Sequence, residues 1–215
     1  MTEPRSDPIM RVMSTAHLMS PAPVRLLALS GMMAALLAVF SWISLPLPFS
    51  PVPVTLQTLG VLLAGALLGP RWGPVSVLVW IGLGLVGAPV YHNGLFGPAV
   101  AFGPTGGFVW SFPVAAFVSG LAARWSLRLP NARIQLLGLA TGFGLAEIVF
   151  YAVGLPWLSF TTGMGLEEAA LVGLLPFLPG DLLKLAAALV LTVGIGRALD
   201  PAATTAPGTS LPSGR

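Results

Sequence analysis

One short segment places an acid and a base on the same helical face. The stretch PGDLLKLAAALV, residues 179–190, carries Asp181 three residues before Lys184, the only lysine in the chain. Residues spaced i, i+3 are neighbours on a helix. A carboxylate beside an ammonium group can bind a ligand that offers both a donor and an acceptor. Alternatively, Asp181 could simply cap the helix while Lys184 extends to a membrane surface.

Three other polar residues are candidates for ligand contact. Glu147, in GFGLAEIVFYAVG, has no cation near it in the sequence. It could carry a proton, form a hydrogen bond to another helix, or face a pocket. Gln57, in VPVTLQTLG, could link two helices or contact a ligand. Asn93, in YHNG, is either a turn residue, since Asn before Gly favours turns, or a ligand contact.

Aromatic and small side chains form two further sets. Aromatic belts at the membrane interface explain most of the outer aromatic residues, but one or two of them could sandwich a ligand ring; they are Trp42, Phe49, Tyr91, Trp110, Tyr151 and Trp157. Ser30, Ala34 and Ala38 form a stripe of small residues, and Gly31 and Ala35 form a parallel one. Such stripes let helices approach closely, either within a bundle or against another membrane protein.

Several kinds of chemistry are excluded or disfavoured. The chain has no cysteine, which excludes disulfides, thiolate metal sites and cysteine nucleophiles. Neither His17 nor His92 has a partner at metal-ligand spacing, so we expect no metal site. The sequence holds no metalloprotease, serine-hydrolase or nucleotide-binding motif, and we expect no cofactor. The basic residues are scattered, which disfavours a nucleic-acid partner.

The composition is that of an all-α integral membrane protein. Hydrophobic residues make up 55% of the chain and charged residues 8%, and the mean hydropathy is +0.90. Since a membrane-spanning helix needs about 20 mostly apolar residues, we predict six spans, at residues 24–45, 55–69, 73–90, 105–123, 134–155 and 180–199. We expect the short second span to join the third through a tight cytoplasmic turn at GPRWGP.

Charge placement predicts how these spans are oriented. With the N-terminus inside, every arginine falls in an inner segment, and the only charged residues of the outer segments are Glu167 and Glu168. This distribution obeys the rule that basic residues concentrate in cytoplasmic loops. We therefore expect an inside N-terminus and an inside C-terminus, in a plasma membrane of the bacterial type. Residues 1–23 and 200–215, rich in polar residues and proline, are expected to be disordered cytoplasmic ends around a membrane domain at 24–199.

The outer segments suggest a covered pocket. The first, PLPFSPVPV, cannot continue a helix because of its prolines, yet it is apolar enough to fold over the bundle. The second is rich in glycine and proline and ends in GPTGGF. Irregular backbone at membrane depth persists only where it is buried in protein or lines a cavity. We therefore expect extracytoplasmic loops that cap a ligand pocket.

Three linked motifs resemble those of one known family. PLPFSPVPVTLQTLGVLLAGALLGPRWG, GPTGGF and LPGDLLK occur in the order and approximate spacing of the BioY family, over roughly residues 26–199. The members are biotin-specific capture subunits of energy-coupling-factor (ECF) transporters. The resemblance implies a six-helix protein that binds biotin on the outer side, beneath a lid formed by the loop after the first helix. It implies no catalytic activity.

The resemblance also implies roles for residues and partners. Asp181 and Lys184 match the family's PGDxxK as biotin contacts, and Gln57 matches its PVxLQ. Asn93 lies in YHNG, where members often have a run such as GGxGG. Implied partners are a transmembrane coupling protein, contacted by small residues of the first helix such as Ala34 and Ala38, and two ATPases; a solitary or oligomeric form is also open. Capture of another small vitamin, or a membrane enzyme that uses Glu147 as acid or base, are the alternatives.

Overall fold

The computed structural model describes residues 21–198, which are mostly helical. The helices are α2 (Pro21–Trp42), α3 (Gln57–Leu85), α4 (Pro98–Ala101), α5 (Gly106–Ser126), α6 (Ala132–Thr162), α7 (Leu166–Gly173) and α8 (Leu178–Ala198), with a 3-10 turn, η1 (His92–Gly94). Five of these helices, α2, α3, α5, α6 and α8, are long and apolar enough to cross a membrane. The expected disordered ends lie outside the described residues, apart from 21–23, which begin α2.

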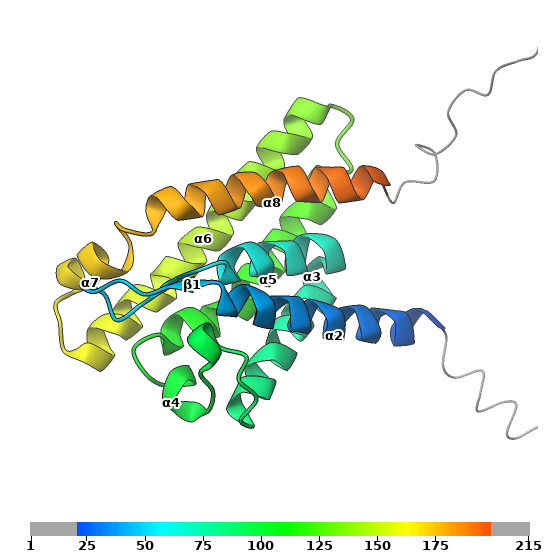
Figure 1. Cartoon of the computed structure of the whole chain (residues 1–215). Coiled ribbons are helices and arrows are strands. Elements are labelled where there is room, and N and C mark those ends of the chain that lie inside the picture. The colour runs from blue at the N-terminus through cyan, green and yellow to red at the C-terminus, as the bar shows by residue number, and fades with distance from the viewer. Residues whose placement is uncertain (1–20, 199–215) are drawn as a thin grey trace, which may run out of the picture.

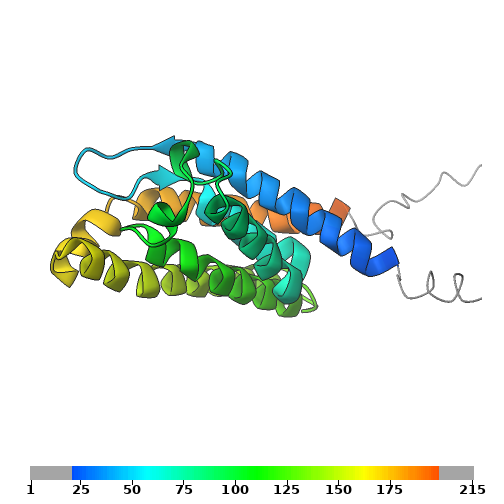
Figure 2. The same ribbon diagram turned by 90° about the horizontal axis from the view of Figure 1, so that it is seen from below.

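The long helices form one bundle whose two ends differ (Figures 1 and 2). Helix α5 packs between α3 and α6, while α2 and α8 both pack on α3. The start of α2, the end of α8 and the α5–α6 connection lie at one end. Helices α4 and α7 lie toward the other end, together with the hairpin of β1 (Ser44–Leu45) and β2 (Val54–Thr55). The irregular segments are thus gathered at one end of the bundle.

The predicted second and third spans are the two arms of α3. Only Gly69 is non-helical within this helix, with φ 80° and ψ 176°. A side chain at that φ would be strained, which is why glycine suits the position. The expected turn over GPRWGP was therefore too long, because Pro70 already begins the second arm. Its missing N–H is harmless there, since first-turn N–H groups have no helical acceptor.

Glycines allow very close packing of the two arms of α3 on each other and of α5 on α3. A Cβ atom at Gly73 would lie 2.7 Å from the Gly65 Cα atom, so the second arm packs directly against the first. A Cβ atom at Gly120 of α5 would lie 2.7 Å from backbone atoms of Gly69 and Pro70. Glycines at these points let backbone pack on backbone, as membrane helices commonly do.

The fifth predicted span continues as a helix beyond its predicted end. We placed that end at residue 155, but α6 continues through Pro156 to Thr162, and α7 follows before α8 begins. Proline removes only one helical hydrogen bond, and a bundle in lipid keeps the remaining backbone groups paired within the helix. Gly163, with φ 74°, then ends α6 in a left-handed cap.

The proline-rich segment between α2 and α3, residues 43–56, folds over the bundle as predicted; we call it the hairpin segment. Its ends pair as a minimal antiparallel hairpin, Ser44 with Thr55 and Leu45 with Val54. Between the strands, Val52 is buried in a small apolar cluster whose other buried members are Phe108, Leu158, Ala169 and Phe177. Burial of Val52 among residues of α5, α6 and α7 holds the segment down at this end of the bundle.

Candidate ligand-binding site

Asp181 and Lys184 form a buried ion pair in the first turn of α8. The Lys184 Nζ atom lies 2.6 Å from the Asp181 Oδ1 atom, and the two side chains are only 7–8% exposed. Lys184 therefore does not extend to the membrane surface. A buried pair of this kind is stable only when further hydrogen bonds satisfy both groups.

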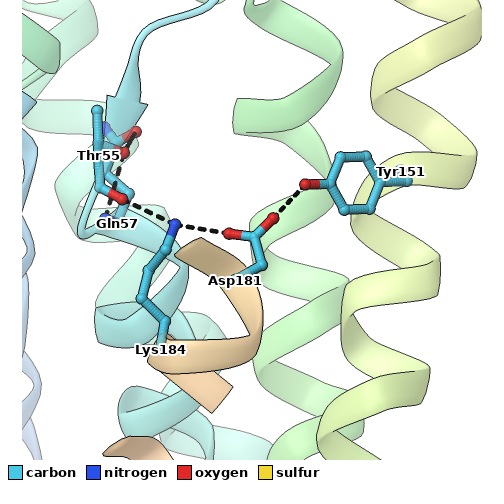
Figure 3. A network of polar contacts seen from close by, with 5 residues as sticks. All are labelled: Thr55, Gln57, Tyr151, Asp181 and Lys184. Atoms are coloured by element: carbon cyan, nitrogen blue, oxygen red, sulfur yellow. Dashed lines mark hydrogen bonds and ion pairs between the residues drawn. The ribbon is translucent and has the colours of Figure 1, made fainter. Parts of the chain in front are cut away.

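Two contacts from distant segments supply these hydrogen bonds, as Figure 3 shows. The Lys184 ammonium group donates to the Thr55 carbonyl oxygen of β2 at 2.9 Å. On the opposite side, the Tyr151 hydroxyl of α6 donates to Asp181 Oδ2. The pair thus connects the hairpin segment, α8 and α6.

Gln57 continues this polar network toward α2. Its Oε1 atom accepts a hydrogen bond from the Thr55 hydroxyl at 3.0 Å, and its Nε2 group donates to Ser41 Oγ at 2.9 Å. The Ser41 hydroxyl donates to the Leu37 carbonyl oxygen within α2. Gln57 therefore links helices and, at the same time, stands in the wall of the pocket next to Lys184.

These groups line a pocket beneath the hairpin segment. Its cavity volume is about 30 Å³, room for one or two water molecules, so the walls of the pocket lie close together. The apolar walls are mainly aromatic, with Phe112 and Phe150 stacked at a centroid distance of 5.4 Å. The polar groups converge from the hairpin segment, α3, η1, the residue before α5, and α8; they are Thr55, Gln57, Thr58, His92, Thr105, Asp181 and Lys184.

His92 lines the pocket from η1, and burial lowers its pKa from the ordinary value. Its imidazole is therefore neutral at pH 7, with one nitrogen that donates and one that accepts. The charges of Asp181 and Lys184 cancel each other, so the pair adds no net charge to the pocket. The pocket therefore suits a ligand with a ring system and a few donors and acceptors rather than a strongly cationic one.

The remaining candidate residues surround the pocket without lining it. Asn93 is exposed and adopts the left-handed conformation, with φ 55°, so the structure places it as a turn residue. Tyr151 lies behind Asp181 and faces a separate apolar groove between α6 and α8. Glu147 lines the same groove and a small void beneath the pocket.

The stripe of Ser30, Ala34 and Ala38 faces the interior. Ser30 and Ala34 are at most 1% exposed, and Ala38 packs on the main core. A partner protein would not reach the first two without displacing neighbouring helices, so their position favours packing within the bundle. The parallel residues Gly31 and Ala35 are exposed instead.

Several pocket residues were not singled out from the sequence. Phe108 is the last residue of GPTGGF, and Phe112 follows it at i+4, so both lie on one face of α5. Phe150 and Phe177 gave no local signal that separates them from other apolar residues. Thr55 acts through its backbone carbonyl, which no residue type can indicate.

Comparisons with known proteins agree on one family. The chain matches the model of the BioY family over residues 11–201. It is 36% identical to the biotin transporter BioY of Rhizobium etli, over 82% of this chain and 96% of that protein. It is 38% identical to the probable biotin transporter BioY of Bacillus subtilis, over 77% and 87%.

A solved structure has the same fold. The crystal structure of the S-component for biotin from an ECF-type ABC transporter matches with a TM-score of 0.73 and 30% identity. The match covers 83% of this chain and 94% of that one.

Proposed function

Because this chain belongs to the BioY family, we propose that it captures biotin as the membrane-embedded S-component of an ECF-type ABC transporter. It is a transport component rather than an enzyme, and a multi-pass protein of the cell membrane. The observation that carries the proposal is the buried Asp181–Lys184 pair at the polar side of an aromatic pocket.

The chemistry of biotin suits this pocket. Its ureido ring offers one carbonyl acceptor and two N–H donors, and its bicyclic ring system is apolar enough to lie against Phe112 and Phe150. Asp181 can accept from a ureido N–H, because each carboxylate oxygen has more than one lone pair. Lys184 donates to Asp181 and Thr55, which leaves one N–H for the ureido carbonyl or the valerate carboxylate.

Six membrane crossings fit the helices better than five. The kink at Gly69 divides α3 into two arms, and the second arm returns against the first. With both termini inside, the pocket and the hairpin segment then face the outside, and the hairpin segment acts as the lid. The implied partners, a coupling protein and two ATPases, would approach α2 at its exposed residues, among them Gly31 and Ala35.

The test is calorimetric titration of the purified protein in detergent. We expect one-site binding of biotin, at nanomolar to low-micromolar strength, and no saturable binding by a panel of other small vitamins. Biotin amide, which lacks the carboxylate charge, separates the two poses: unchanged affinity places the ureido ring at Lys184, and a large loss places the carboxylate there. Absence of binding in a folded, ligand-free sample would contradict the proposal.

Partner proteins are tested separately by co-purification from native membranes. Recovery of a coupling protein and two ATPases supports the complete transporter. Recovery of this chain alone, as a monomer or oligomer that still binds biotin, would contradict the complex while leaving capture intact.

A further inference from the structure

A second polar site lies beneath the ligand pocket. Both carboxyl oxygens of Glu147 on α6 and the Thr58 hydroxyl on α3 are buried, and none of them has a hydrogen-bond partner within residues 21–198. Both residues line one small void between α3, α5 and α6, and aliphatic side chains form most of its remaining wall. Buried polar groups nearly always have partners, so a void that holds two unsatisfied ones indicates a ligand.

The charges around Glu147 show which form of the carboxyl group fits. The titratable groups that interact with it electrostatically are Asp181 and Lys184 on α8 and Tyr151 on α6. Lys184 is already paired with Asp181, and the Tyr151 hydroxyl donates to Asp181. An ionised Glu147 would be a second buried anion with no hydrogen bond, and the cost of such a group is many kcal/mol. A bound proton removes that cost.

The size of the void indicates the second ligand. It has room for about one water molecule. A water molecule there could accept from a protonated Glu147 and bond to the Thr58 hydroxyl, which gives it the two partners that a buried water requires.

We propose that the void between Thr58 and Glu147 binds one proton, held on Glu147, and one water molecule that bridges the two side chains. The site adjoins the ligand pocket, because Thr58, Phe112 and Phe150 belong to the walls of both. It also adjoins the apolar groove between α6 and α8 through Glu147. The bridging water therefore lies directly behind the pocket wall formed by Thr58, Phe112 and Phe150.

Infrared spectroscopy of the full chain in lipid, without biotin, tests the proton. At pH 7 we expect a carbonyl band of a protonated carboxyl group that is absent in Glu147→Gln, a variant of the same size and neutral charge. Glu167→Gln is the control, because Glu167 is exposed on α7 and should not contribute to the band. A wild-type spectrum without a band that Glu147→Gln removes would overturn the proposal.

Thr58→Val tests the bridge. Loss of the hydroxyl should shift the Glu147 carbonyl band to higher frequency, because the bridged hydrogen bond is weakened. Thr192→Val is the matched control, since the Thr192 hydroxyl is also buried and without a partner in the described chain but lies outside the void. An unshifted band in Thr58→Val, or an equal shift in Thr192→Val, would rule out the bridging water. Neither result depends on whether the protein binds biotin.

Discussion

Lys184 joins α8 to the hairpin segment through one ammonium group. It pairs with Asp181 on its own helix and donates to Thr55 at the base of the hairpin segment. Lys184 also lines the pocket that we propose for biotin. Under the proposed function the same residue anchors the lid and contacts the ligand, so we expect its removal to affect stability and binding together unless the charges are balanced.

Balanced substitution of the ion pair separates the two effects. Lys184→Met or Asp181→Asn alone leaves one buried charge without its partner, and we expect a loss of about 3–5 kcal/mol of stability. The double variant Asp181→Asn/Lys184→Met removes both charges and should recover most of that loss while binding biotin at least about 100-fold more weakly, since hydrogen bonds to charged groups contribute about 1.5–3 kcal/mol each. Thermal unfolding and calorimetry measure the two quantities. A folded double variant with wild-type affinity would refute the site.

Tyr151 is expected to position Asp181 rather than to touch the ligand. Tyr151→Phe removes the hydroxyl that donates to Asp181 Oδ2 and keeps the ring that packs on Phe108 and Phe150. We expect biotin affinity to fall about 5- to 10-fold, in line with one hydrogen bond of about 1 kcal/mol. The loss should disappear in the Asp181→Asn background, since Tyr151 acts through that residue. Additive losses in the double variant would instead indicate a direct ligand contact.

Close helix packing at glycine is the main feature at the scale of elements. A Cβ atom at Gly65 in the first arm of α3 would collide with the Ser119 hydroxyl and the Ala116 backbone carbonyl of α5. We expect Gly65→Ala to cost at least about 1–3 kcal/mol, as overpacking does, and to lower the thermal midpoint. Gly82→Ala in the same helix has nothing within 4 Å of the new atom and serves as the control. Equal midpoints in the two variants would contradict this packing.

The sequence predicts helices better than it predicts their ends. Apolar length located α5 within three residues, but it could not show that a single residue, Gly69, turns α3 or that α6 continues past Pro156. Whether a proline or glycine ends a helix depends on its position in that helix and on the packing around it, and residue spacing alone does not show this. For the site, helical spacing found Asp181 and Lys184, whereas the contacts to Thr55 and Tyr151 join residues far apart in the chain.

Exposed basic and acidic residues lie toward opposite ends of the bundle. Three exposed arginines lie in or beside the α5–α6 connection, at the end where α2 begins and α8 ends; they are Arg124, Arg128 and Arg133. Exposed Glu167 and Glu168 lie on α7, toward the opposite end. Because arginine concentrates on the cytoplasmic side, this arrangement supports the proposal that the pocket faces outward.

Single cysteines can test the number of crossings, since the natural chain has none to give background labelling. In intact cells, a membrane-impermeant maleimide should label Glu167→Cys, whereas Arg71→Cys and Leu129→Cys should react only after permeabilisation. All three positions are exposed. If α3 crossed only once, position 71 would lie within the membrane rather than at the inner surface, and positions 129 and 167 would exchange sides relative to an inside N-terminus. Labelling of Leu129→Cys from outside, with Glu167→Cys protected, would therefore overturn the six-crossing topology and the outward-facing pocket that depends on it.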